Sequence, residues 1–446
     1  FEVKEMISNA EKLDNGVEGL LSKTGQTVFA EHLLTNILPK DIADSHLSGD
    51  LHITYPGLWS LLPDIIFINV KELIEDGINP RGKSLNVSRI PSVKTLDNLS
   101  SALSMIISLI SKEASQEVVM DGLISLLSKY SKKLPELEQK IVEAFVKSST
   151  TLKYNKAPTM VSFVIHLGTE QKIVNAVLSA YRTYTQLTPI PMIGLIINYE
   201  KGVVSHVSEI LSEIITLGGK IMFSKHHVSQ KGIIHSKNTN VTSLHLCSLS
   251  INLPRLAFES NKDETYFRAR LALLMKPALT SMALRKKSIS DLVRLGINPV
   301  LGDNTQYMQR SSVSLIVNLI GLHNAVYGIL GFKDDKAGKE ILHKVIETAV
   351  DIASKKAKEL SVNVMICITE SDGSDRFVSL DEEKYGKDSI LKIIDGETYS
   401  QGITLDGGTM TELTAKSAEI VECNKITKIL NGGLLVPLKI PEGTKV

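Results

Sequence analysis

The sequence has few cysteines and almost no net charge. Its three cysteines, Cys247, Cys367 and Cys423, are scattered over 446 residues, which excludes a disulfide framework and favours a reducing, cytoplasmic compartment. The chain has 50 Lys and Arg against 49 Asp and Glu, which gives a net charge of +1. This balance lacks the positive charge of a dedicated nucleic-acid-binding protein.

Long hydrophobic runs are absent as well. The most apolar stretches, such as residues 192–198 and 433–438, are far shorter than the roughly 18 residues of a membrane-spanning helix. No signal peptide is evident after Phe1. The sequence also has no Gly-rich phosphate loop, nucleophile elbow, zinc-binding helix or kinase-type lysine strand at the required spacing. We therefore expect neither a membrane protein nor a member of those enzyme classes.

Apolar residues recur at helical spacing through most of the first 150 residues. Leu99, Leu103, Ile106 and Ile110, for example, share one face of a helix expected within residues 96–133. Gly and Pro residues between positions 49 and 82 indicate short elements and turns there. Residues 1–150 are therefore predicted to form a mostly helical N-terminal segment.

From residue 151 onward, short β-branched runs alternate with longer amphipathic segments. The predicted buried strands are residues 161–167, 192–198, 220–223, 244–253, 313–320 and 363–368. The predicted helices are residues 171–187, 205–217, 263–286 and 339–360. This alternation favours crossover connections and an α/β sheet or barrel buried on both faces. We expect residues 151–446 to form this α/β unit, with residues 1–150 packed on it in one structure.

Polar residues cluster between two of the predicted strands. His226, His227, His235, His245 and Cys247 are residue types that ligate transition metals. Their spacing fits no closed zinc pattern, and the chain has no Cys-x-x-Cys pair, so we predict surface histidines and no metal site. Cys247 stands in an apolar run, where a buried hydrophobic role and a reactive thiol are both open.

Several separated strings of the sequence, taken in order, resemble those of one enzyme family. They are ILPK at 37–40, GDLHI at 49–53, SINLPRLA at 250–257, IGLH at 320–323, and DRF at 375–377 followed by Asp381 and Tyr385-Gly386. These strings resemble the anaerobic, class III ribonucleoside-triphosphate reductases, which are glycyl radical enzymes. The resemblance covers about residues 15–433. It implies a ten-stranded α/β barrel of the ribonucleotide reductase type with an N-terminal helical layer.

The resemblance also implies a reaction that needs a thiyl radical. In the family this radical forms on a cysteine at the tip of a loop inside the barrel and abstracts a hydrogen from the ribose. Here that cysteine is expected at residues 223–227, and a second one near Ile65, but neither place has a cysteine. The family's zinc module and glycyl radical loop are also not found before Val446. The sequence therefore predicts a non-catalytic reductase-fold protein with a binding or assembly role.

The resemblance assigns a set of candidate site residues. Those expected to bind a nucleotide are Arg255, Thr369, Glu370 and Ser371. Thr369, Glu370 and Ser371 stand where the family has a loop that leads into a helix. The N-terminus of such a helix favours a phosphate. The expected ligand is a nucleoside triphosphate. We expect no further cofactor in this chain, and a homo-oligomer is the default assembly.

Two alternative functions stay open from the sequence. The first is an active ribonucleotide reductase in which Cys247 is the catalytic thiol and Asn252 orients the substrate. Its radical module would then come from another chain or from a part of the protein outside this sequence. The second is an unrelated α/β enzyme with a metal at the histidine cluster.

Overall fold

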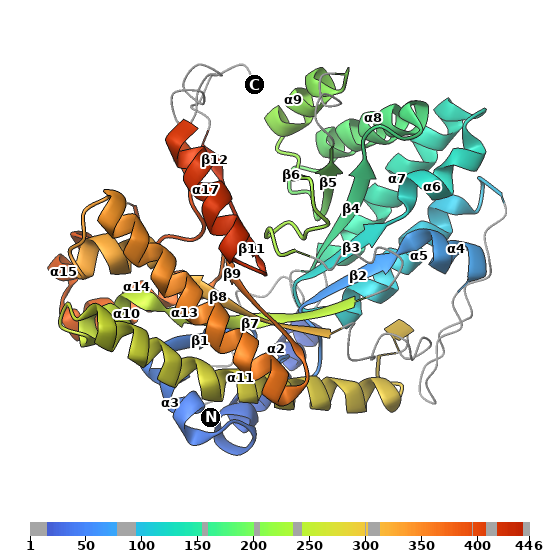
Figure 1. Cartoon of the computed structure of the whole chain (residues 1–446). Coiled ribbons are helices and arrows are strands. Elements are labelled where there is room, and N and C mark those ends of the chain that lie inside the picture. Colours follow the sequence, from blue (N-terminus) through green and yellow to red (C-terminus); the bar gives the residue numbers. More distant parts are fainter. Residues whose placement is uncertain are drawn as a thin grey trace.

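A ten-stranded sheet forms the centre of the molecule (Figure 1). This computed structural model describes residues 16–77, 95–153, 159–199, 206–234, 243–298, 300–301, 313–394, 396–406 and 417–439. The strands of the sheet are β1 (Leu51–Ile53), β2 (Ile65–Asn69), β3 (Glu117–Asp121), β4 (Met160–His166), β5 (Ile193–Asn198), β6 (Ile221–Ser224), β7 (Ser243–Asn252), β8 (Val313–Ile320), β9 (Asn363–Ile368) and β11 (Gly433–Leu434). A separate pair is formed by β10 (Leu405–Asp406) and β12 (Leu438–Lys439).

The sheet consists of two parallel halves that meet antiparallel. Its order is β11-β9-β8-β7-β2-β3-β4-β5-β6, and β1 pairs with β7 outside this path. Strands β2 to β6 are parallel to one another, as are β7, β8, β9 and β11. The halves join where β2 pairs antiparallel with β7 and Ile65 lies opposite His245. The carboxyl ends of the two sets of strands therefore point to opposite ends of the molecule.

Helices cover the outer face of both halves (Figure 1). Their bounds are α2 (Gly16–His32), α3 (Lys40–Ser48), α4 (Val70–Asp76), α5 (Leu99–Ile110), α6 (Leu123–Leu127), α7 (Leu134–Lys153), α8 (Gln171–Leu187), α9 (Ser208–Thr216), α10 (Leu253–Glu259), α11 (Glu264–Arg294), α13 (Lys336–Leu360), α14 (Gly373–Tyr385), α15 (Lys387–Leu391) and α17 (Ser417–Ile429). Helices α5, α7 and α8 pack beside β2 to β6, whereas α11 and α13 pack beside β7 to β9. None of the described helices is long and apolar enough to cross a membrane.

Alternate residues of the buried strands belong to two different hydrophobic clusters. Val161 and Phe163 of β4 pack in the large cluster formed with the helices. Val164 belongs to a smaller cluster on the inner face of the sheet, together with Val228 and Ile233 from the segment after β6. The side-chain alternation of a strand explains this division. It also shows that the segment after β6 enters the inside of the curved sheet.

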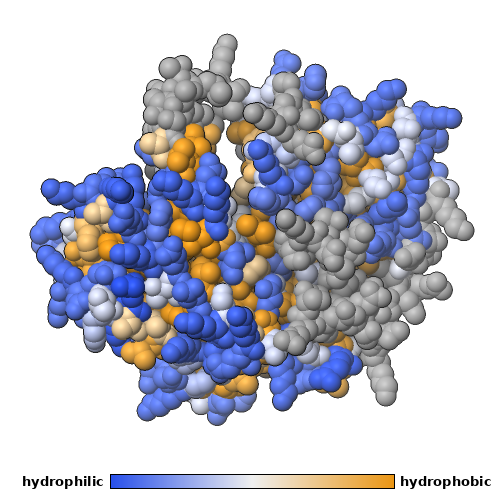
Figure 2. Space-filling view, in the orientation of Figure 1, coloured by the Kyte–Doolittle hydropathy of each residue, from blue (hydrophilic) through white to orange (hydrophobic). Residues whose placement is uncertain are grey.

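One face of the molecule is hollowed between the two halves (Figure 2). Figure 2 shows apolar side chains along part of this hollow, while hydrophilic side chains cover most of the remaining described surface in that view. The exposed apolar residues of the flanking elements include Phe223 of β6 and Val421 of α17. In this view the hollow lies between the half that carries β6 and the half that carries α17.

The N-terminal segment differs from its sequence-based description. The helix expected within residues 96–133 ends at Ile110, and β3 follows at Glu117–Asp121. Helical spacing stops at Ile110, and Val118 and Val119 instead pair with β2 and β4. The first 150 residues thus supply β1, β2 and β3 to the sheet as well as helices. The division at residue 150 stays a prediction.

Candidate functional site

A hairpin made of residues 228–234, here called the barrel hairpin, occupies the inside of the sheet. Val228 forms an antiparallel bridge with Ile234, and the Gly232 amide donates a hydrogen bond to the Ser229 carbonyl at 2.9 Å. Gly232 has a φ of +74°, a conformation that glycine adopts without a steric penalty. These contacts place Lys231 at the tip of the hairpin.

The tip of the hairpin is bound to the beginning of β3. The Gln230 amide donates hydrogen bonds to both carboxylate oxygens of Glu117 at 3.1 Å, and Ser162 Oγ donates to the same carboxylate at 2.6 Å. Burial raises the pKa of Glu117, and these hydrogen bonds oppose that rise. Lys231 Nζ donates to Gln116 Oε1 at 2.8 Å. The ammonium group therefore has a defined position inside the molecule.

A cavity of about 800 Å³ lies next to this tip. It is formed where β9 ends and α14 begins, together with residues 398–404. Its lining side chains include Lys231, Asn324, Glu370, Ser371, Asp372 and Gln401. The volume is in the range of pockets that enclose small organic ligands. Because most of the lining residues are polar, the cavity fits a polar ligand.

Hydrogen bonds fix the wall of the cavity at the start of α14. The Ser371 amide donates to Gln401 Oε1 at 2.6 Å, and Ser250 Oγ donates to Ser371 Oγ at 2.9 Å. A Cβ atom at Gly373 would lie only 2.7 Å from Cγ of His52, so the helix can begin this close to β1 only with glycine there. The first turn of α14 is thus held at the cavity.

Asp372 supplies a permanent negative charge to the cavity. His52 Nε2 lies 3.4 Å from Asp372 Oδ1, and Thr54 Oγ1 donates to the same oxygen at 2.7 Å. Burial alone would raise the pKa of Asp372, but the contacts with His52 and Thr54 lower it to about 2. Glu370 and Asp375 are also on the wall. The described lining residues therefore offer acceptors for hydroxyl groups and, on Lys231, an ammonium group for an anion.

Two of the four predicted nucleotide-binding residues line the cavity, namely Glu370 and Ser371. Thr369 is buried, and its backbone forms two hydrogen bonds of 2.9 Å with the side chain of Asn318. Asn318 thereby holds the end of β9 against β8. Thr369 therefore contributes to the position of the wall, and its predicted contact with a ligand stays a prediction.

Arg255 and Asn252 belong to a buried network behind the cavity wall. Arg255 Nε donates to Asp381 Oδ1 at 2.5 Å, while Asn252 Nδ2 and Tyr399 Oη donate to Asp381 Oδ2 at 3.0 and 2.8 Å. Asn252 Oδ1 also caps α10 by accepting a hydrogen bond from the Arg255 amide. Of these four residues only Tyr399 is among those that line the cavity. Their predicted contacts with a substrate or nucleotide stay predictions.

Cys247 lies inside the sheet, beside the barrel hairpin. Its amide donates to Asp64 Oδ2 at 2.6 Å, and its Sγ lies 4.0 Å from Gln116 Oε1, the atom that accepts from Lys231. Burial, followed by the carboxylate of Asp64, raises the pKa of the Cys247 thiol well above its ordinary value. All three cysteines of the chain are among the described residues, and none of them lines the cavity.

Lys231 was not identified from the sequence. Gln230-Lys231-Gly232 between the apolar residues Val228 and Ile233 is a turn signal, but the sequence does not show that this turn lies inside the sheet. The predicted histidine cluster does not form one group among the described residues. His227 lies beside Asp121 and His166, which are not members of that cluster. His245 is buried in β7, so the surface position predicted for it is wrong. His235 lies outside the described residues.

Solved structures of anaerobic ribonucleotide reductases share this architecture. The enzyme from Thermotoga maritima with citrate in the active site superimposes with a TM-score of 0.67 at 14% identity, covering 95% of this chain and 89% of that one. The same enzyme in complex with dATP and CTP gives a TM-score of 0.66 at 13% identity, covering 94% and 83%. The ten-stranded α/β barrel predicted from the sequence is thus confirmed.

Sequence comparisons lead to the same family. The anaerobic ribonucleoside-triphosphate reductase of Haemophilus influenzae is 27% identical over an alignment of 173 residues that covers 35% of this chain. That match spans about a quarter of the relative's length (24%). Residues 202–445, more than half of the chain, match the family model described as anaerobic ribonucleoside-triphosphate reductase. The chain therefore belongs to the anaerobic ribonucleoside-triphosphate reductase family.

Proposed function

We propose that this protein binds a nucleoside phosphate in the cavity between the barrel hairpin and α14 without reducing it. The observation that carries the proposal is Lys231 at the hairpin tip, next to a polar cavity that has no thiol among its lining residues. The family resemblance assigns the radical-bearing cysteine to the tip of a loop inside the barrel. The place expected for it from the sequence is residues 223–227, whereas the hairpin that enters the barrel has its tip at Lys231. An ammonium group cannot form a thiyl radical, but it does attract an anion.

The polar groups of the cavity suit the two parts of a nucleotide. Lys231 and the backbone amides at the beginning of α14 favour a phosphate group. The carboxylates of Glu370 and Asp372 accept hydrogen bonds from ribose hydroxyls. Because these carboxylates also repel a polyphosphate, we expect the ligand to bind more tightly together with Mg²⁺ than alone.

Isothermal titration calorimetry of the full chain with CTP and Mg²⁺ tests the binding. We expect Lys231→Ala to weaken binding by roughly tenfold to a hundredfold, because a hydrogen bond to a charged group contributes about 1.5–3 kcal/mol. Lys147→Ala, at an exposed position of α7, is the matched control and should leave the affinity unchanged. Absence of binding by the unmodified protein, or equal affinities for both variants, would contradict the proposal.

An active reductase is the second candidate, because Cys247 lies so near the hairpin tip. Gln116 Oε1 lies 4.0 Å from the Sγ of Cys247 and 2.8 Å from Lys231 Nζ. Anaerobic incubation with a radical-generating activase and a reductant tests for deoxyribonucleotide formation. The non-catalytic proposal expects no product. If the unmodified protein formed deoxyribonucleotide and Cys247→Ser did not, Cys247 would be the catalytic thiol and the non-catalytic proposal would be refuted.

The assembly state also stays a proposal. We propose a homo-oligomer, since closed symmetric assemblies are the common form of soluble oligomers. Sedimentation equilibrium of the full chain measures it directly. A mass equal to that of one chain, 48.9 kDa, at every concentration tested would reject this part of the proposal.

A further inference from the structure

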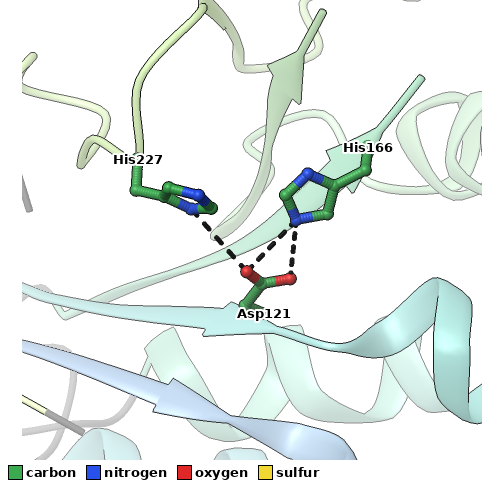
Figure 3. Close-up of side chains that lie close together, drawn as sticks. All are labelled: Asp121, His166 and His227. Carbon is green, nitrogen blue, oxygen red and sulfur yellow. Dashed lines mark hydrogen bonds and ion pairs between the residues drawn. The ribbon is translucent and has the colours of Figure 1, made fainter. Parts of the chain in front are cut away.

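Three potential metal ligands meet where the barrel hairpin begins (Figure 3). Asp121 is the last residue of β3, and His166 is the last residue of β4. His227 follows β6 and directly precedes Val228, the first residue of the hairpin. The strands β3, β4 and β6 are parallel in one half of the sheet, with β5 between β4 and β6. Their carboxyl ends therefore lie at one edge, where the three side chains come together.

The three side chains point toward one another (Figure 3). His166 Nε2 lies 3.0 and 3.1 Å from the two carboxylate oxygens of Asp121. His227 Nδ1 lies 3.7 Å from Asp121 Oδ2. One ligand atom from each residue lies within 4.8 Å of the other two. All three residues are half-buried, so an ion can enter from solvent.

These separations are close to those of donors around a single ion. Nitrogen and oxygen ligands bind Zn²⁺ at about 2.0–2.2 Å, which places neighbouring donors of a tetrahedral site roughly 3.3 Å apart. Two imidazoles and one carboxylate are a common protein donor set for divalent transition metals and leave a position for water. A shift of less than about 1 Å in the His166 and His227 rings would therefore suffice to complete the coordination.

Neighbouring groups orient two of the three ligands. The Gly122 amide donates to Asp121 Oδ1 at 2.5 Å, which fixes the carboxylate. Asn198, opposite His166 in β5, donates through Nδ2 to the His226 carbonyl at 3.4 Å, so the segment that carries His227 is tied to β5. Such surrounding hydrogen bonds are typical of metal sites because they hold the ligands in place before the ion binds.

We propose that Asp121, His166 and His227 form a binding site for one divalent transition metal ion, with Zn²⁺ as its best fit, that anchors the base of the barrel hairpin to β3 and β4. The site lies at the end of the barrel opposite the cavity, because the cavity is at the carboxyl ends of β8 and β9. It does not depend on the proposed nucleotide function. The ion joins His227 to two strands of the sheet, four residues before Lys231 at the hairpin tip.

Titration of the metal-stripped full chain tests the site. Co²⁺ should bind with one ion per chain and give visible absorption bands, and Zn²⁺ should displace it. We expect Asp121→Asn, His166→Ala and His227→Ala each to weaken Zn²⁺ binding by more than about a hundredfold. Even the loss of a residue that only hydrogen-bonds to a metal ligand lowers metal affinity about 10–100-fold. His226→Ala is the matched control, because His226 is exposed and adjacent but not part of the cluster.

Several outcomes would overturn the assignment. No binding of Zn²⁺ or Co²⁺ by the unmodified protein would leave only a histidine–aspartate hydrogen bond at this place. If His226→Ala weakened Zn²⁺ binding as much as the three ligand variants, or if those variants kept their Zn²⁺ affinity, the ion would lie elsewhere. Circular dichroism of each variant identifies those that fail to fold, and Asp121→Asn keeps the shape of the original side chain.

Proteolysis tests the anchoring role separately. Trypsin can cleave after Lys225 and Lys231, which lie on either side of His227. We expect Zn²⁺ to slow cleavage at both positions at least severalfold in the unmodified protein, with no effect in His166→Ala. If cleavage is unchanged while one Zn²⁺ is bound, the ion does not anchor the hairpin and that part of the proposal is wrong.

Discussion

Replacement of Arg285 by methionine should strongly destabilise the protein. Arg285, on α11, is 1% exposed and donates to both carboxylate oxygens of Asp64 at 2.6 and 2.8 Å. Its remaining hydrogen bonds go to Ser248 Oγ and to the carbonyls of Trp59 and Leu62. The guanidinium group therefore connects α11 to β7 and to the segment that leads into β2.

The expected cost follows from the groups that Arg285→Met would leave behind. Asp64 is also 1% exposed. Without the guanidinium, its donors among the described residues are the Ser115 hydroxyl and the Cys247 amide. Removing one partner of a buried ion pair costs about 3–5 kcal/mol, because the other charge remains buried without compensation. Arg285→Met combined with Asp64→Asn should recover part of this loss, since no buried charge then remains.

Urea denaturation of the full chain measures the change in free energy of unfolding. The matched control is Arg182→Met, which breaks the 2.9 Å pair between Arg182 and Glu213 at the surface. That substitution should cost less than about 1 kcal/mol. If Arg285→Met lowered the free energy of unfolding no more than Arg182→Met does, the reasoning would be refuted. Burial of the Arg285–Asp64 pair would then have no energetic consequence.

Three further predictions concern other buried or strained positions. Burial, opposed by two backbone hydrogen bonds, raises the folded-state pKa of Glu113 to about 7; its stabilising contribution is therefore complete below about pH 4.5 and lost as the pH rises through 7. Urea titrations measure the free energy of unfolding, which should fall between pH 5 and 8 by roughly 2 kcal/mol more in the unmodified protein than in Glu113→Gln. The same pH dependence in both proteins would contradict this. Gly321→Ala places a Cβ 2.4 Å from Pro254 Cγ at a φ of +74°. Gly331→Ala is the control, because φ is +80° there but no atom lies within 4 Å of the added Cβ. Thermal melting should show that Gly321→Ala destabilises the protein by about 2 kcal/mol more than Gly331→Ala. Burial raises the pKa of the Cys367 thiol to about 12, so iodoacetamide at pH 8 should label it roughly a thousandfold more slowly in the native protein than in urea; equal rates would show that it is accessible.

Apolar runs and amphipathic patterns made much of the fold after residue 150 predictable. The strands predicted at 313–320 and 363–368 and the helix predicted at 171–187 have the same bounds in the structure. Each of these segments has a pattern that is set by burial on one or both faces. By contrast, β2 and β3 are five residues long and follow helical or turn-rich stretches, so their pairing with distant strands determines them more than local pattern does.

The candidate sites depend on contacts between residues that are distant in the sequence. Glu370 and Ser371, which line the cavity, were predicted from a family resemblance because they stand in a partly recognisable loop before a helix, and their contact with a nucleotide stays a prediction. Asp121, His166 and His227 were not predicted as a group, since their proximity arises only from the alignment of parallel strand ends. Local spacing, on which metal sites are usually recognised, carries no signal for such a cluster.

The antiparallel junction between β2 and β7 has a consequence for how the chain folds. Each of the strands β3 to β6 pairs with the strand synthesised just before it, after an intervening segment that contains at least one helix. The barrel, however, cannot assemble until β7 is made, because β7 carries both the contact with β2 and the contact with β8. Pairing of residues so distant in sequence slows folding. During translation the edge of β2 therefore stays unpaired until β7 is made, and in that interval it is exposed to aggregation or chaperone binding.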